Sequence, residues 1–417
     1  MNLLIKSATI IDKESKFHLK TVDILIENGC FSKIEERIEN KNQSQEINLP
    51  NLHVSKGWFD SSVSFGEPGY EERETLTHGF EVAAKSGFTD IAINPNTNPV
   101  IDAKTDVQFI LSKAKVSPIN AYPIGALTIG SEGLDLAELY DMQQSGAIAF
   151  NDYKKAVQNP NLLKLALLYV QNFNGLVCSF PQDHHIAGKG VINEHNTSTA
   201  LGLKGIPALA EALQIARDIS ILEYTGGKLH IPTISTKTSV NLIKEAKSKG
   251  LDVSCSVAIH NLMFTDAVLK EFDTNYKVLP PLRTQKDIDA LTSGLNDGTI
   301  DMVTTDHCPI DIEFKKIEFN RAQYGTIGLE TAFSALLTQF SLEKTIALLT
   351  QGRERFNLNE PKIEVNAPAE LSLFTPEGTD IFKIENILSS SKNSAYINME
   401  TKGRVYGSIN KGELSLA

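Results

Sequence analysis

The chain has 417 residues, of which 41% are hydrophobic and 22% charged, a composition typical of a globular protein. This length exceeds what one hydrophobic core usually serves, so we expect one large domain and one smaller domain. The formal net charge of −11 disfavours nucleic acid and anionic membranes as partners, and the sequence predicts neither a signal peptide nor a membrane span. We therefore predict a cytoplasmic protein.

Both ends of the chain alternate apolar and polar residues in short runs. Residues 1–54 have the pattern of antiparallel strands and hairpins, and a similar pattern returns over residues 356–417. The simplest architecture pairs these two segments. We therefore predict a small β-domain formed by both chain termini, with the middle of the chain inserted between them.

Residues 55–355 alternate strand patterns with helical patterns. The eight apolar runs are Trp58–Val63, Phe88–Ile93, Ala121–Ile129, Ala147–Phe150, Leu176–Cys178, Leu229–Ile231, Val253–Val257 and Ile300–Val303. Helical spacing of apolar residues occurs between them, for example over 162–170, 209–216 and 240–246. This order predicts an α/β fold, a (β/α)8 TIM barrel. A doubly wound open sheet is the alternative, because periodicity alone cannot close a barrel.

A barrel places chemistry at the C-terminal ends of its strands. In Ser62-Val63-Ser64, at the first strand end, the two serines share a face because side chains alternate along a strand. Histidines there would form a metal-binding pair. A binuclear zinc or iron site requires about four histidines plus carboxylates. The strand ends offer only His260 and His307, with Asp152 and Asp306, which is too small a set for two metals.

Several longer motifs occur in order along the chain. They include Glu67-Pro68-Gly69, Asn94-Pro95-Asn96-Thr97-Asn98-Pro99, Pro280-Pro281-Leu282-Arg283-Thr284, Thr305-Asp306-His307 and Gly328-Leu329-Glu330-Thr331. Together they resemble dihydroorotase of the amidohydrolase superfamily, in the type found in multifunctional pyrimidine-synthesis proteins. The resemblance implies the barrel and β-domain described above. It also implies, for active members, hydrolysis of the cyclic amide of dihydroorotate, or its closure from carbamoyl aspartate, at a zinc site.

The family's functional positions are mostly replaced in this sequence. The resemblance places its metal ligands at Ser62, Ser64, Tyr153 (in preference to Asp152), Phe180 and Thr233. Its carboxylate-binding arginine, an asparagine and a histidine fall on Gly66, Leu279 and Ile310. The general-base position Asp306 and the substrate-binding positions Asn96, Tyr324 and Gly325 are retained. Because hydroxyl and phenyl groups do not replace imidazole as zinc ligands, we expect no metal cofactor and an idle Asp306.

Three functional hypotheses follow. The first is a pseudoenzyme with a structural or regulatory role, a homo-oligomer whose partner, by resemblance to inactive relatives, is aspartate transcarbamoylase. The second is an active metal-dependent cyclic amidase that recruits His184, His185 or His260. The third is a metal-free binding module that uses Asn96, Asp306 and the Tyr324-Gly325 backbone. A structural alternative has Asp306 capping loop amides while His307 packs nearby.

Overall fold

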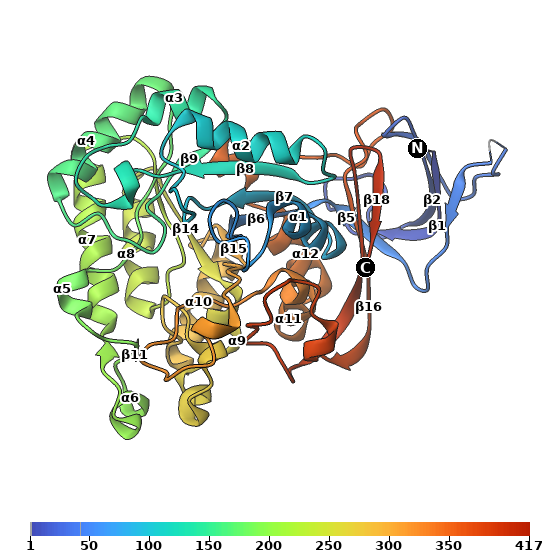
Figure 1. The fold of residues 1–417 in the computed structure, drawn as a ribbon. Helices are drawn as coiled ribbons and strands as arrows, with labels where there is room; N and C mark the ends of the chain where they lie inside the picture. Colours follow the sequence, from blue (N-terminus) through green and yellow to red (C-terminus); the bar gives the residue numbers. More distant parts are fainter. Residues whose placement is uncertain (1, 42) are drawn as a thin grey trace.

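Two sheets organise the chain in the computed structural model, which describes residues 2–41 and 43–417. One sheet is built from the two ends of the chain and the other from its middle, and the two lie at opposite sides of Figure 1. Among the described residues, no helix combines the length and the apolar character needed to cross a bilayer.

The terminal sheet interleaves strands from both ends of the chain. Its N-terminal strands are β1 (Leu3–Ile10), β2 (Thr21–Glu27), β3 (Cys30–Glu35), β4 (Gln45–Ile47) and β5 (His53–Lys56). Its C-terminal strands are β16 (Leu371–Ile381), β17 (Glu400–Asn410) and β18 (Glu413–Leu416). The two sets join where β5 pairs antiparallel with β16, Leu371 lying opposite Lys56. A small β-domain formed by both termini is therefore confirmed.

The middle of the chain forms eight parallel strands whose spatial order follows the sequence. They are β6 (Trp58–Val63), β7 (Phe88–Ile93), β8 (Asn120–Gly125), β9 (Ala149–Phe150), β10 (Val177–Cys178), β13 (Leu229–Ile231), β14 (Val253–Ala258) and β15 (Met302–Thr304). The last strand returns to the first through a parallel bridge between Val63 and His307, and Ser64 N donates to His307 O at 2.7 Å. The sheet therefore closes into a barrel, and the open-sheet alternative is wrong.

Helices surround this barrel. The outer helices are α1 (Leu76–Lys85), α2 (Lys104–Ala114), α3 (Leu139–Gln144), α4 (Pro160–Val170), α7 (Ala208–Thr225), α8 (Lys237–Ser248), α10 (Gln285–Asp297), α11 (Ala332–Gln339) and α12 (Leu342–Thr350). Local signals set several starts. Asn159 caps α4 with Pro160 in its first turn, and Pro207 immediately precedes α7. Shorter pieces lie in the loops: α5 (His184–Ala187), β11 (Ile192–Asn193), α6 (Asn196–Leu201), β12 (Gly205–Ile206) and α9 (Ile259–Met263).

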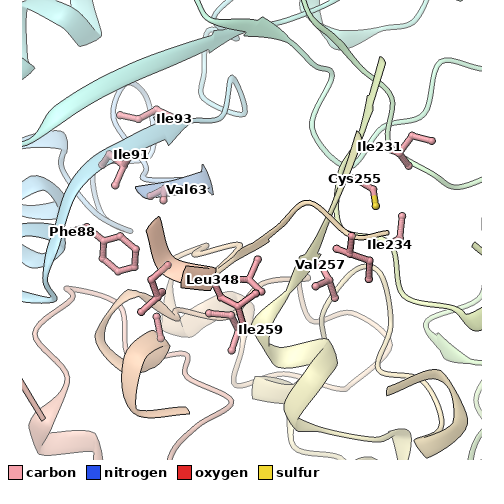
Figure 2. Packing of buried hydrophobic residues seen from close by; sticks show 14 of the residues in the cluster. Val63, Phe88, Ile91, Ile93, Ile231, Ile234, Cys255, Val257, Ile259 and Leu348 are labelled. Carbon is pink, nitrogen blue, oxygen red and sulfur yellow. The ribbon is translucent and has the colours of Figure 1, made fainter. Parts of the chain in front are cut away.

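Two apolar clusters hold the barrel together. The larger one fills the layer between strands and helices, and Figure 2 shows Phe88 and Ile91 from β7, Val257 from β14 and Leu348 from α12 within it. The smaller one draws residues from six strands together with Phe356, and strands on different sides of a barrel meet only across its interior. This packed interior leaves the C-terminal edge of the strands as the place for a site.

Candidate functional site

The first strand ends in hydroxyl groups that are bonded within the protein. Asn94 Nδ2 donates to Ser62 Oγ at 3.0 Å and to Ser64 Oγ at 3.2 Å. Ser62 and Ser64 are 6% and 1% exposed. Ser62 and Ser64, predicted from the resemblance to stand at ligand positions, therefore carry small, buried hydroxyls that Asn94 links to each other.

Asp306 is the centre of the barrel mouth and is 1% exposed. Its Oδ1 accepts hydrogen bonds from Tyr153 OH at 3.1 Å and from Ser62 Oγ at 3.3 Å. Its Oδ2 lies 2.8 Å from Lys154 Nζ, a contact held by charge and not by a well-aligned hydrogen bond. The Lys154 side chain is only 12% exposed. The carboxylate that would act as the general base is therefore neutralised by a cation of this chain.

Tyr153 and Asp152, the two candidates for the family's bridging carboxylate, point in different directions. Asp152 accepts from Thr128 N at 2.9 Å and from Thr128 Oγ1 at 2.5 Å, so its carboxylate is used by the neighbouring loop. The Tyr153 hydroxyl instead meets Asp306. Burial, together with the negative charge of Asp306, raises the pKa of Tyr153 well above its usual value. The phenol therefore remains a protonated donor at neutral pH.

The opposite side of the mouth is apolar. Phe180, 2% exposed, packs with Ala187, Ala210 and Leu279, and Tyr324 lies against this cluster. Thr233 is 3% exposed, and its backbone N donates to Ser256 Oγ at 3.1 Å. Phe180 offers no ligand atom, and Thr233 offers at most a neutral hydroxyl.

The two histidines of the mouth are buried and uncharged. His307 accepts at Nδ1 from Gly328 N at 3.2 Å and packs edge-on against Phe65. Its Nε2, and both ring nitrogens of His260, have no hydrogen-bond partner among the described residues. Burial lowers the pKa of His307 to about 3 and that of His260 to about 4. His307 thus packs as the structural alternative expects, whereas the partners of the Asp306 carboxylate are side chains and not loop amides.

The remaining predicted residues are spread around the rim. Asn96 Oδ1 is buried without a partner in the described part of the chain. Tyr324 OH donates to Gly190 O at 3.3 Å, and Gly325 N donates to Lys277 O at 3.0 Å. Ile310 is 3% exposed. Within residues 2–41 and 43–417, no three His, Cys, Asp or Glu side chains gather closely enough to hold a metal ion, and this includes His184 and His185 on α5.

Gly66, predicted from the resemblance to stand at the family's arginine position, has no room for a side chain. A Cβ atom at this position would lie 1.8 Å from Tyr70 O and 2.7 Å from the Tyr70 carbonyl carbon. The close approach is fixed by hydrogen bonds, because Gly66 N donates to Glu74 O at 2.9 Å and Tyr70 N donates to Gly66 O at 3.0 Å. The loop over residues 66–74 therefore leaves no space for an arginine side chain at position 66.

The donor set of the mouth does not fit the zinc centre that the fold implies. Zinc prefers thiolate, imidazole and carboxylate ligands, and the family's ligand positions here offer neutral hydroxyls and a phenyl ring. The remaining carboxylate, Asp306, already holds the Lys154 ammonium at 2.8 Å. A metal ion bound to that carboxylate would also meet the charge of Lys154. The arrangement is that of an internal ion pair supported by hydroxyl donors.

Lys154 was missed by the sequence analysis. It follows directly after Tyr153, and strand alternation would turn two consecutive side chains to opposite sides. In the structure β9 has already ended at Phe150, and Lys154 has a φ of +58°. This left-handed residue allows both side chains to reach Asp306. The lysine directly after Tyr153, a predicted ligand position, is the signal that could have indicated the contact with Asp306.

Comparisons with known proteins give the family from sequence and the fold from structure. Residues 53–239 match the family model described as dihydro-orotase-like. The chain is 36% identical over 423 residues to a dihydroorotase of Geobacter metallireducens, covering 99% of each protein. It is 37% identical over 404 residues to a dihydroorotase of Ruminiclostridium cellulolyticum, covering 95% of this chain and 94% of that protein. Among solved structures, an L-hydantoinase (dihydropyrimidinase) from Arthrobacter aurescens superposes with a TM-score of 0.84 at 20% identity, covering 99% of this chain and 95% of that one.

Proposed function

This chain belongs to the dihydroorotase family, and we propose that it is a member without the metal-dependent reaction, serving pyrimidine biosynthesis as a structural or regulatory subunit. The observation that carries the proposal is the ion pair between Lys154 and Asp306. It joins the retained general-base position to a cation that cannot act as a Lewis acid or activate water.

The chemistry of the mouth supports this proposal. A general base in amide hydrolysis needs a free oxygen within hydrogen-bond reach of an activated water or of the substrate. Here Tyr153 and Ser62 donate to one oxygen of Asp306, and Lys154 lies on the other. Gly66 also offers no guanidinium for a substrate carboxylate. Both substrate binding and water activation would therefore need groups that these positions do not supply.

The decisive experiment measures metal and turnover on the same purified protein. We expect elemental analysis to find zinc far below one ion per chain, and we expect dihydroorotate and carbamoyl aspartate to react no faster than in buffer. Asp306→Asn should leave this background unchanged. Stoichiometric zinc, together with turnover that Asp306→Asn abolishes, would refute the proposal.

Aspartate transcarbamoylase is the proposed partner, and the cytoplasm the proposed location. Both rest on the resemblance and on composition: some inactive relatives hold the trimers of that enzyme together, and the chain has a net charge of −11. Co-expression followed by size-exclusion chromatography tests the partner. A shared peak of defined stoichiometry is the expected result, and separate elution of the two proteins contradicts it.

A second candidate, an active metal-dependent dihydroorotase, is favoured by His260. Its two ring nitrogens are buried without a hydrogen-bond partner in the described chain, which is uncommon for a neutral imidazole. Adding zinc or manganese to the chelator-treated protein discriminates the two functions. Metal-dependent turnover that His260→Ala removes, while the exposed His185→Ala retains it, would establish this candidate.

A third candidate, a metal-free binding module, is favoured by Asn96, whose Oδ1 is buried without a partner in the described chain. Such an atom is available to accept a hydrogen bond from a ligand. Titration calorimetry with carbamoyl aspartate tests this candidate. Heat that Asn96→Ala abolishes would support it, and the absence of heat would exclude it for this compound.

A further inference from the structure

The loop over residues 311–324, called here the 311–324 loop, follows β15 and ends at the barrel mouth. Asn393 holds its two ends together, because its Nδ2 donates to Cys308 O at 3.0 Å and to Gly325 O at 3.2 Å. Tyr324, the last residue of the loop, lies against the apolar side of the mouth. A compact loop whose ends are held together is an Ω-loop. Such a loop can open as one unit while its two ends stay in place.

Two buried lysines clamp this loop to the segment 274–277. Lys315, on the loop, donates from Nζ to Thr274 O at 2.8 Å. Lys277, on the segment, donates from Nζ to Phe319 O at 2.7 Å. Both lysines are 2% exposed. The clamp is therefore reciprocal, since each of the two pieces of chain places an amine among the backbone carbonyls of the other.

The remaining acceptors of the two amines are also backbone carbonyls. Lys277 Nζ donates to Asn320 O at 3.1 Å, and Lys315 Nζ donates to Gln323 O at 3.0 Å. Lys315 has a third, long contact of 3.5 Å to Lys277 O. An ammonium has three N–H donors and a neutral amine has two, so each lysine can keep its two short hydrogen bonds in either form. The clamp thus does not require a charge on the amines.

The charged and titratable groups that surround Lys315 do not neutralise it. Cys308 carries a buried thiol whose pKa is raised by burial, so it is uncharged at neutral pH. Lys154 and Lys277 repel the charge of Lys315, and Asp273 attracts it from beyond ion-pair distance. The loop itself adds Asp311, Glu313, Lys316, Glu318 and Arg321, and within the described chain none of these forms an ion pair with Lys315.

Burial of the two amines penalises their charged forms. Desolvation lowers the pKa of Lys315 to about 7 and that of Lys277 to about 8. The rings of Phe319 and Tyr324 lie 5.4 and 4.9 Å from Lys277 Nζ, and their π faces partly compensate its charge. Burial raises the pKa of the Tyr324 hydroxyl to about 12, so this ring stays neutral. Lys315 is therefore the group of the clamp that titrates nearest to neutral pH.

We propose that Lys315 is a pH-sensitive latch of the 311–324 loop, so that protonation of its amine favours release of the loop and deprotonation favours attachment. In the released loop the amine lies in water and has a pKa of about 10.4. The released form thus binds the proton more tightly than the attached form. Acidification from about pH 10 to about pH 7 shifts the equilibrium toward release by up to about tenfold per pH unit. Below about pH 7 both forms are charged, and the equilibrium no longer changes.

Release of the loop changes the barrel mouth. Tyr324 OH donates to Gly190 O at 3.3 Å, and this contact would be lost together with the packing of the Tyr324 ring against the apolar cluster. The mouth therefore becomes more open as the pH falls. This inference involves neither a metal nor turnover, so its outcome is independent of the proposed function.

Hydrogen exchange of the full chain, followed by mass spectrometry of peptides from residues 311–323, measures the opening of the loop. Dividing each rate by that of the unstructured peptide at the same pH removes the intrinsic pH dependence of exchange. We expect the opening constant to rise at least about tenfold from about pH 8.5 to about pH 7. Peptides from α8 are the internal reference and should show no such rise.

Two substitutions of the latch remove its titration. Lys315→Arg keeps a cation at both pH values, and Lys315→Met carries none. Either variant should reduce the rise to about fourfold or less, the part that Lys277 contributes. Lys316→Met, at an exposed neighbouring position, is the matched control and should retain the rise of the wild type. A rise that is absent from the wild type, or that persists in both Lys315 variants, overturns the proposal, as does an equal loss in Lys316→Met.

Discussion

Replacing Lys154 by methionine removes the cation from the barrel mouth while keeping a side chain of similar length. Asp306, 1% exposed, then loses its counter-charge and retains only the hydrogen bonds from Tyr153 and Ser62. At 2.8 Å the attraction between the two charges is about 6 kcal/mol at an effective dielectric constant of about 20. Desolvation of both groups offsets part of it, and breaking a buried pair typically costs about 3–5 kcal/mol.

We therefore expect Lys154→Met to lower the free energy of unfolding by about 3 kcal/mol in urea at neutral pH. Lys155→Met is the matched control, because this neighbouring lysine is exposed and its Nζ donates to a backbone carbonyl, Ser131 O, at 3.2 Å. Adding Asp306→Asn to Lys154→Met removes both charges. The double variant should be destabilised by less than the sum of the two single variants, with a coupling energy of about 2 kcal/mol. Equal loss in Lys154→Met and Lys155→Met, or strict additivity in the double variant, would refute the reasoning.

Two further substitutions test the burial of a histidine and the tight loop at Gly66. Burial lowers the pKa of His230 to about 3, so the unfolded chain, with a pKa near 6.5, binds the proton more tightly. The stability contributed by the neutral ring is therefore present above about pH 6.5 and is lost as the pH falls toward 3. The wild-type protein should lose unfolding free energy between about pH 7 and 4.5, and His230→Gln should make this loss smaller by about 2–3 kcal/mol. Urea titrations at the two pH values measure the loss, and an equal loss in the wild type and the variant contradicts the prediction. Gly66→Ala places a Cβ 1.8 Å from Tyr70 O and should lower stability by about 1–3 kcal/mol, and an unchanged melting temperature would show that the loop yields freely.

The fold could be predicted from the sequence because the patterns that indicate it, apolar strand runs alternating with helical spacing, are local and repeated. Each of the eight predicted apolar runs overlaps one barrel strand, although β8 begins at Asn120 and ends at Gly125 and not at Ile129, and β14 and β15 each end one residue after the predicted run. The closure of the sheet into a barrel could not be established from the sequence pattern alone, because it depends on the bridge between Val63 and His307, which lie far apart in sequence. The exposure of Leu209 and Leu213 on α7 could not be predicted either, since helical spacing of apolar residues does not say which side of the helix is buried.

The sequence predicted which positions of the site carry unusual residues, but it could not predict the hydrogen-bond and ion-pair partners of those residues. Three residues around the mouth, Lys154, Thr233 and Asp306, have φ values of +58°, +50° and +48°. Side chains rarely adopt this left-handed conformation, and it is often found at functional sites. It turns Lys154 toward Asp306 in a way that no spacing rule predicts. The close approach of Tyr70 to Gly66 is set by backbone hydrogen bonds within residues 66–74, which the sequence pattern did not indicate.

The ion pair also bears on how the site could be restored. A well-packed apolar pair in place of two buried charges is often neutral or stabilising, so stability alone does not explain why Asp306 is kept with a cation beside it. The ammonium group of Lys154 compensates the charge of the buried Asp306 carboxylate. Unlike a metal ion, it has no open coordination position. Returning histidines to positions 62 and 64 would leave that ammonium on Asp306 and the loop over residues 66–74 without space for an arginine. The loss of function proposed here therefore lies in the cation and the loop as much as in the missing ligands.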